Sequence, residues 1–311
     1  MIAIQKARDL SWLSQASYLG FDGIAAGTSG AALSTRVQTS AEGPGNVFAE
    51  GQADTFANSS TGFRFVSQLP NTPNGTSVAV FGSNDSNDGA YTISVRGTEP
   101  FGQLVPTDLL QDLFGVVLAG KAKVQLIEAF RYYKQVTTPG GQAVVYSNQE
   151  VNAISSVLLS GTILTGQLEN LAAAIVAFQA LSANDKRLGA SGQTLVPNGS
   201  KVNFTGHSLG GHVAYLLAQL VESTRSDSRS LGDVVTYNAP GENALIFEIQ
   251  NWMGIDTSSQ AGTIGSKHLA LYGLGGLNVT AGLGQVIGTR KPIFIETDGP
   301  ILGGLSIGNH S

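Results

Sequence analysis

The segment Gly206-His207-Ser208-Leu209-Gly210 constrains the fold of this chain more than any other part of the sequence. A short β-rich run at 201–205 precedes it, and a helical pattern follows, with apolar residues at helical spacing: Val213, Leu216, Leu217, Leu220 and Val221. Glycines two residues before and two after a serine let a strand and a helix pack closely around a sharp turn, because neither carries a Cβ. The motif and its context predict that Ser208 is a nucleophile presented at the edge of a sheet.

The composition indicates a large apolar core and a lightly charged surface. Hydrophobic residues make up 42% of the 311 residues and charged residues 13%. The net charge is −5, and no basic run is present, which argues against nucleic acid as a partner. We expect a single catalytic domain over 1–311, in which 1–75 is a Gly- and Ser-rich N-terminal region of one helix and loops packed on the rest.

Cysteine usage and the apolar runs limit the chemistry and the location. The chain has no cysteine, which excludes disulfides, thiol catalysis and Cys-type zinc sites. We expect no cofactor and no metal. The first residues contain no uninterrupted apolar stretch, and no run of about 18 apolar residues follows, so neither a cleavable signal peptide nor a transmembrane segment is expected. Export without a cleavable signal peptide is the expectation, and the cytoplasm is the alternative.

Strand-like and helix-like segments alternate along the chain. Strands are expected at 78–81, 91–95, 201–205, 234–237, 268–272 and 292–296, the first two joined as a hairpin. Helices are expected at 6–20, 107–134, 148–185 and directly after Ser208, whereas 21–75 suggests loops and short strands. This alternation predicts an α/β fold of the α/β-hydrolase type, with a largely parallel central sheet flanked by helices.

A serine nucleophile on such a sheet needs a histidine base that follows it in the chain. His212 lies within the helix after Ser208, and His268 begins an expected strand, where its side chain would point into the sheet environment. His310 follows the last expected strand in a glycine-rich loop, which is where this fold presents its base. We therefore predict His310 as the general base.

The acid of the triad is less sharply indicated. It orients the imidazole and stabilises the imidazolium, so it should emerge at the carboxyl end of a late strand. The carboxylates near that edge are Asp256, Glu242, Asp298 and Glu296. We favour Asp256, in the loop before 268–272. Asn278 follows that strand directly, but an amide does not stabilise an imidazolium comparably.

The backbone N–H of Leu209 is the predicted oxyanion donor at the start of the helix. Donors there lack intrahelical partners, and the helix dipole favours negative charge. Losing one such donor typically costs about 3 kcal/mol of transition-state stabilisation.

Two further segments give the chain a specific resemblance. Arg96-Gly97-Thr98 follows the strand at 91–95, Gly211 extends the serine motif, and an acidic segment lies at 108–112. Over about 76–311 the chain resembles the class 3 lipases of the α/β-hydrolase superfamily, and it is similar to bacterial secreted lipases and phospholipases A1. The resemblance implies that Ser208 is the nucleophile, that His310 is the base, and that Thr98 joins Leu209 in the oxyanion hole. The family usually has Asp and a hydrophobic residue after the penultimate strand, whereas Asn278-Val279 stands here.

The resemblance implies a serine esterase that hydrolyses carboxylic esters of lipids through an acyl-enzyme, with contact to a lipid interface. A phospholipase A1, a peptidase or an acyltransferase on the same scaffold is one alternative. A non-catalytic hydrolase-like binding protein is the other. Two apolar runs, at 109–118 and 173–178, are each either a lid or an ordinary core helix.

Overall fold

Seven strands form the central sheet of the computed structural model, and they lie side by side in the order in which they occur in the sequence. The structure describes residues 2–39, 47–73, 75–97, 118–154, 195–241, 257–274, 286–294, 301–302 and 305–306. The strands are β1 Phe63–Leu69, β2 Val78–Ser83, β3 Tyr91–Val95, β4 Lys201–His207, β5 Ser230–Tyr237, β6 His268–Leu274 and β7 Thr289–Phe294. The pairs β1–β2 and β2–β3 are antiparallel, and every pair from β3 to β7 is parallel. Two short strands, β8 Ile301–Leu302 and β9 Leu305–Ser306, form a separate antiparallel pair.

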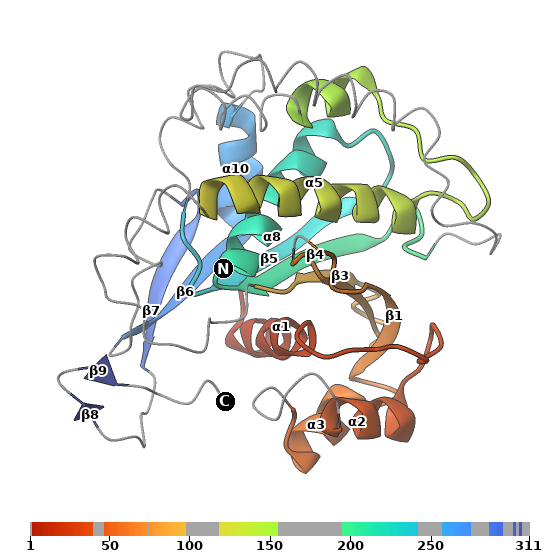
Figure 1. The fold of residues 1–311 in the computed structure, drawn as a ribbon, viewed down its shortest axis with the longest axis vertical. Helices are drawn as coiled ribbons and strands as arrows, with labels where there is room; N and C mark the ends of the chain where they lie inside the picture. The colour runs from red at the N-terminus through yellow and green to blue at the C-terminus, as the bar shows by residue number, and fades with distance from the viewer. Residues whose placement is uncertain are drawn as a thin grey trace.

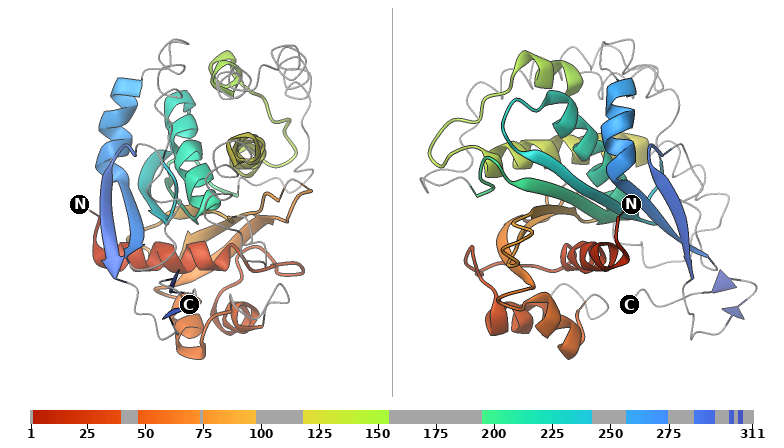
Figure 2. Two further views of the ribbon diagram at one scale, coloured as in Figure 1. Left: turned by 60° about the vertical axis from the view of Figure 1, so that its left-hand side comes forward. Right: turned by 180° about the vertical axis from the view of Figure 1, so that it is seen from behind.

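Helices cover both faces of the sheet (Figure 1). On one face lie α5 Leu118–Thr137, α8 Leu209–Thr224 and α10 Thr257–Lys267, and on the other lie α1 Ile4–Ala16, α2 Gly30–Gln38 and α3 Glu50–Phe56 (Figure 2). Successive side chains of β2 point alternately into the two hydrophobic cores on either face of the sheet. Val78 and Val80 pack in the cluster that contains α5 and α8, whereas Ala79 and Phe81 pack in the cluster that contains the first three helices. Burial on both faces explains why the strand is a continuous apolar run in the sequence.

The predicted α/β class with a mostly parallel sheet is confirmed. The expected strands at 78–81, 91–95, 201–205, 234–237 and 268–272 all lie within observed strands, and the hairpin is β2–β3. The last strand begins earlier than expected, at Thr289 instead of Pro292. Of the expected helices, 6–20 corresponds to α1, 107–134 overlaps α5, and 148–154 is helical; the remainder of 107–134 and of 148–185 lies outside the described residues.

The prediction of loops and short strands for 21–75 was wrong in part, because α2 and α3 lie there beside β1. These helices are short, so they show little periodicity, and packing against distant residues holds them in place: α2 buries Leu33 and Val37, and α3 buries Phe56. Phe56 of α3 packs edge-on against Phe48 and Phe81, with ring centroids 5.0 and 5.7 Å apart. Such tertiary contacts override a weak local pattern. Among the described residues, no helix has the length and hydrophobicity needed to cross a bilayer.

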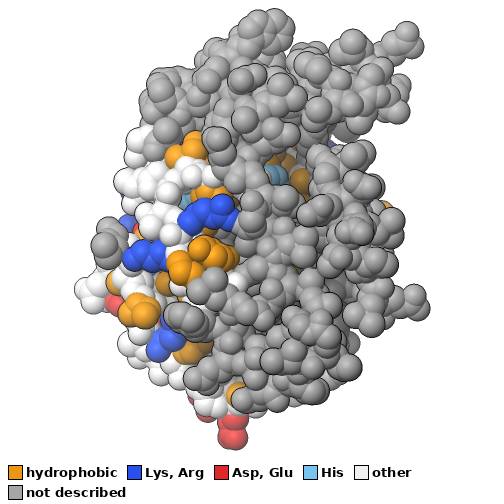
Figure 3. Space-filling model, turned by 90° about the vertical axis from the view of Figure 1, so that its left-hand side faces the viewer, with side chains coloured by type: hydrophobic (Ala, Val, Ile, Leu, Met, Phe, Trp, Pro, Cys, Tyr) orange, Lys and Arg blue, Asp and Glu red, His pale blue; other side chains and the backbone are white. Residues whose placement is uncertain are grey.

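Strand β7 forms one edge of the sheet. Thr289 to Ile293 are exposed, and the strand carries Arg290, Lys291 and Pro292. The described part of this side of the molecule shows basic side chains among hydrophobic ones (Figure 3). Positive charge and proline on an edge strand both discourage pairing with another strand, because charges repel and proline offers no N–H.

Candidate active site

Ser208 occupies a strained turn between β4 and α8. Its φ is 54° and its ψ is −129°, a conformation that costs a non-glycine residue about 1–3 kcal/mol. The Ser208 N–H donates to the carbonyl of Tyr237 at the end of β5, at 2.8 Å. The His212 N–H donates to the Ser208 carbonyl at 3.1 Å and starts the helix. The turn has the strand–serine–helix geometry expected of a nucleophile elbow, and the backbone of Ser208 holds it against the neighbouring strand.

The glycines on both sides of Ser208 are required by close backbone contacts. A Cβ on Gly206 would lie 2.7 Å from the carbonyl oxygen of Val95, and one on Gly210 would lie 2.5 Å from the carbonyl carbon of Arg96. A Cβ on Gly211 would lie 2.8 Å from the Cβ of Ala239. The first turn of α8 therefore packs directly against the chain as it leaves β3 and β5.

Leu209, the predicted oxyanion donor, is the first residue of α8, and its side chain is buried. The first N–H groups of a helix have no intrahelical acceptor, and they lie at the positive end of the helix dipole. Gly97, the last described residue before Thr98, lies beside this turn: a Cβ on Gly97 would lie 3.4 Å from the Gly210 nitrogen and 2.6 Å from the His207 carbonyl oxygen. The chain that leads to Thr98 thus passes next to the start of α8.

The three described histidines are engaged in structural contacts. His207 Nδ1 lies 3.4 Å from the Tyr18 hydroxyl, and His212 Nδ1 lies 3.1 Å from the carbonyl oxygen of Pro240. His268 contacts the Ile287 carbonyl oxygen through Nδ1 at 2.8 Å and the Thr236 hydroxyl through Nε2 at 3.1 Å. Its place at the start of β6, away from the strand ends near Ser208, agrees with its exclusion as the base.

Burial also makes two of these imidazoles poor bases. Desolvation lowers the pKa of His268 to about 4, although its hydrogen bond to Ile287 partly opposes the shift. Desolvation lowers the pKa of His212 as well, and the contact with Pro240 again opposes it. A general base works best with a pKa near the operating pH, so neither ring suits that task.

The family model for class 3 lipases matches residues 93–248, half of the chain. The chain belongs to the class 3 lipases. The match begins in β3 and ends after β5, so it covers the end of β3, Gly97, the elbow and all of β5. The parallel sheet and the strand–serine–helix turn are those of an α/β-hydrolase fold, and lipid ester hydrolysis is the chemistry of this family.

Solved lipase structures align with this class 3 lipase along most of its length. Lip2 lipase from Yarrowia lipolytica is 13% identical, covers 98% of this chain and 84% of its own, and gives a TM-score of 0.41. M37 lipase is 13% identical, and the alignment covers 86% of this chain and 67% of M37 lipase with a TM-score of 0.38. A third structure is a triacylglycerol lipase whose catalytic centre is a serine protease triad. It is 14% identical, and the alignment covers 90% of this chain and 74% of that lipase with a TM-score of 0.35. No curated protein matches the sequence at a significant level.

Of the five predicted site residues, the structure describes Ser208 and Leu209, which are adjacent. Thr98, Asp256 and His310 lie outside the described residues. The alternative acid candidates and the runs considered as lids lie outside them too, except for Leu118 at the start of α5: Glu242, Asn278, Glu296, Asp298, 109–117 and 173–178. Within the described ranges, no three His, Asp or Glu side chains gather as a metal site would require.

Asn238 is a further residue at the carboxyl ends of the strands, and no sequence motif indicated its role. It follows β5 with a φ of 49°. Its N–H donates to the Leu271 carbonyl and its Oδ1 accepts the Gly273 N–H, both at 2.8 Å. Asn238 therefore joins the ends of β5 and β6, next to the strand that carries Ser208. The available signal was its residue type, since asparagine tolerates positive φ better than most residues.

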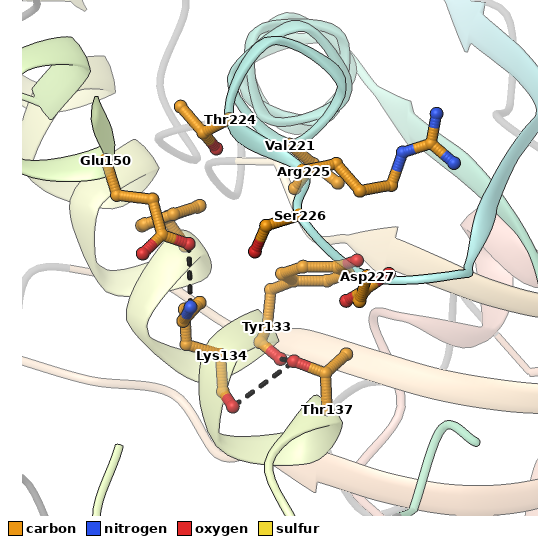
Figure 4. A pocket seen from close by; sticks show the side chains of 10 residues that line it. Tyr133, Lys134, Thr137, Glu150, Val221, Thr224, Arg225, Ser226 and Asp227 are labelled. Carbon is orange, nitrogen blue, oxygen red and sulfur yellow. Dashed lines mark hydrogen bonds and ion pairs between the residues drawn. The ribbon is translucent and has the colours of Figure 1, made fainter. Parts of the chain in front are cut away.

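A small pocket elsewhere in this lipase is remote from the elbow (Figure 4). It lies between α5, the helical segment 148–154 and the C-terminal end of α8, and its volume is about 30 Å³, room for little more than water. Lys134 Nζ and Glu150 Oε1 form an ion pair at its wall, 2.6 Å apart. Val221, in its lining, lies about 20 Å along α8 from Ser208 at 1.5 Å per residue. The pocket takes no part in the site.

Proposed function

We propose that this class 3 lipase is a serine hydrolase that cleaves carboxylic esters of lipids through an acyl-enzyme. Ser208 Oγ attacks the ester carbonyl carbon and gives its proton to the base. The C–O bond to the alcohol breaks, and the departing alcohol takes that proton. Water then attacks the acyl-serine and releases the fatty acid. The strained backbone of Ser208 at the start of α8 is the observation that carries this proposal.

His310 is the proposed base of the triad. The other three histidines support this assignment, because each is held in a contact that serves the fold. Asp256 is the proposed acid, on the chemical ground that a carboxylate stabilises an imidazolium better than an amide.

Thr98 is the proposed second oxyanion donor beside Leu209. The contact of Gly97 with the turn at Ser208 supports the pairing, because it brings the chain before Thr98 next to His207 and Gly210, which stand on either side of Ser208 and Leu209. Two N–H groups from different segments would then stabilise the negative charge on the substrate oxygen.

The substrate and location are proposed on the resemblance to bacterial secreted lipases. The enzyme would act at a lipid interface after export from the cell. Phospholipase A1 and acyltransferase activity share the same acyl-enzyme. They differ in the headgroup of the donor and in the acceptor, which is water in the first case and an alcohol in the second.

The deciding experiment compares Ser208→Ala with Ser223→Ala, a matched change at the other end of α8. Hydrolysis of p-nitrophenyl esters should fall on the order of 10⁶-fold in the first variant, because triad members act as a unit. It should stay near native in the second. A fluorophosphonate probe should label Ser208 in the folded native chain, as located by peptide mass spectrometry.

Other results would redirect the proposal. A loss below tenfold in Ser208→Ala, with unchanged circular dichroism, would remove Ser208 from the mechanism. Absence of both labelling and hydrolysis in the native chain would favour the binding protein. Cleavage restricted to the sn-1 position of phospholipids would indicate a phospholipase A1. Acyl transfer to an added alcohol in preference to water would indicate an acyltransferase.

A further inference from the structure

The hydroxyl of Tyr18 lies between the two chain segments that form the elbow region. It accepts the backbone N–H of Gly97 at 3.2 Å, and it lies 3.4 Å from Nδ1 of His207. Gly97 directly precedes the proposed oxyanion donor Thr98, and His207 directly precedes Ser208. A side chain from the N-terminal region therefore contacts residues next to both groups that act on the substrate carbonyl.

Helix α1 brings Tyr18 to this place by crossing the sheet (Figures 1 and 2). A hydroxyl from each of three neighbouring strands donates to a carbonyl of α1. The Thr205 hydroxyl of β4 lies 3.1 Å from the Leu10 carbonyl oxygen and shares its proton with the Val235 carbonyl oxygen at 2.8 Å, and Ser94 of β3 donates to Leu13 at 2.8 Å. Tyr237 of β5 donates to the carbonyl of Ala7. These contacts fix the helix over β5, β4 and β3, and Tyr18 follows its end beside the exit of β3.

The contact between Tyr18 and Gly97 is tight. A Cβ on Gly97 would lie 2.6 Å from the Tyr18 hydroxyl oxygen. Gly97 is buried, so loss of the acceptor would leave its N–H without a hydrogen bond away from water, which is costly. The chain after β3 would then move to find another acceptor. Small displacements of this kind matter in catalysis, since a shift of about 1 Å can reduce a rate on the order of 100-fold.

We propose that Tyr18 is a positioning residue for the oxyanion hole. By accepting the Gly97 N–H, it sets where the chain carries Thr98 relative to Leu209 on α8. The same hydroxyl lies 3.4 Å from His207 Nδ1, so one side chain contacts both the chain before Thr98 and the residue before Ser208. This inference rests on the proposed hydrolase function and extends it to the N-terminal helix.

The test is Tyr18→Phe, which keeps the ring and removes the acceptor. We expect kcat for p-nitrophenyl esters to fall roughly 10- to 100-fold, with KM within about twofold of native, because the donors act mainly in the transition state. The affinity for a boronic acid that mimics the tetrahedral intermediate should fall by a similar factor.

Ser94→Ala is the matched control. It removes a hydrogen bond between α1 and β3 but leaves the Tyr18–Gly97 contact in place. It should lower the thermal unfolding midpoint while kcat stays within about twofold of native. Equal effects of both variants on stability, with loss of kcat in Tyr18→Phe alone, would separate positioning from a general role in docking α1.

Three outcomes would overturn the inference. The first is a Tyr18→Phe enzyme with native kcat, and the second is a loss confined to KM. The third is a loss of kcat that Ser94→Ala reproduces. In each of these cases native hydrolysis and labelling of Ser208 keep the proposed function intact. A native chain that neither hydrolyses esters nor reacts with fluorophosphonate would overturn the proposed function, and the positioning role with it.

Discussion

Two non-glycine residues of the described chain have a positive φ, Ser208 at 54° and Asn238 at 49°. They follow β4 and β5, which are neighbours in the sheet, so both lie at the carboxyl ends of the central strands, beside the candidate site. The two residues differ in what their side chains do. Asn238 Oδ1 accepts a hydrogen bond from Gly273, whereas Ser208 makes no side-chain cap on its helix. No side-chain cap compensates the strain at Ser208, which is what its proposed role as the nucleophile predicts.

Replacing Ser208 with glycine should stabilise the fold and abolish hydrolysis. Glycine adopts positive φ without a Cβ clash, and the relief of about 1–3 kcal/mol exceeds the entropy that glycine loses, about 0.5–1 kcal/mol. The free energy of unfolding should rise by about 1 kcal/mol in a urea titration. Ser208→Ala should show little gain, because it keeps the Cβ.

Asn238→Gly is the comparison variant, because it also places glycine at a position with positive φ. It removes the acceptor for the Gly273 N–H, so the free energy of unfolding should fall by about 1 kcal/mol. If Ser208→Gly lowers the free energy of unfolding as Asn238→Gly does, relief of backbone strain does not govern the stability change at Ser208.

At the scale of elements, β6 begins with a buried histidine that packs against the elbow helix. The His268 ring stacks on Tyr215 of α8 with centroids 4.4 Å apart, and both of its ring nitrogens have polar contacts. The pKa of His268 is lowered to about 4 by burial, from 6.5. As the pH falls below 6.5, the unfolded chain takes up a proton that the folded chain does not bind until about pH 4. The contribution of His268 to stability is thus present at neutral pH and is lost across this window.

The free energy of unfolding should therefore decrease between pH 6.5 and pH 4, with His268 contributing on the order of 3 kcal/mol. Urea titrations at stepped pH would measure the decrease. His268→Asn keeps an amide donor for Ile287 and does not titrate, so its stability should depend less steeply on pH. His212, whose pKa is also lowered, leaves a residual slope in that variant. Parallel curves for native and variant chains would contradict the prediction.

The helices and strands that could be predicted from the sequence are those whose burial requires a recognisable local pattern of apolar residues. Strands β2 to β6 are largely buried and were found from their runs of apolar and β-branched residues, whereas α8 was found from the helical period of its apolar stripe. Helices α2, α3 and α10 are short, and distant packing holds them in place: Phe56 of α3, for example, rests on Phe81 of β2. The start of β7 was missed because its first residues are exposed and charged, as suits an edge strand.

At the scale of the whole molecule, the site combines segments that are far apart in the sequence. Ser208 and Leu209 could be predicted because the elbow is a local motif whose glycines have a steric reason. Tyr18 could not, since its contact with Gly97 depends on how α1 crosses the sheet and not on any spacing in the chain. The same holds for Asn238, whose partners belong to β6. Motifs identify the reacting groups, whereas the residues that position them come from tertiary structure.

The acid of the triad is the point where these two kinds of argument diverge. Chemistry favours Asp256, because a fixed negative charge stabilises an imidazolium strongly in a partly dry site. Chain position favours residue 278, which follows β6, the strand that Asn238 ties to β5. Asn278, however, carries no charge. We weigh the charge more heavily and predict that Asp256 orients His310.

Asp256→Asn should then reduce turnover on the order of 10⁴-fold with the fold intact, because the amide favours the wrong imidazole tautomer. Steady-state kinetics on p-nitrophenyl esters would measure the loss, and Asp22→Asn, at an exposed turn, is the matched control and should behave as native. His310→Ala should cost about as much as Ser208→Ala, since triad members act as a unit. If Asp256→Asn stays active while Asn278→Asp raises turnover, the acid belongs after β6 and the charge argument at Asp256 fails.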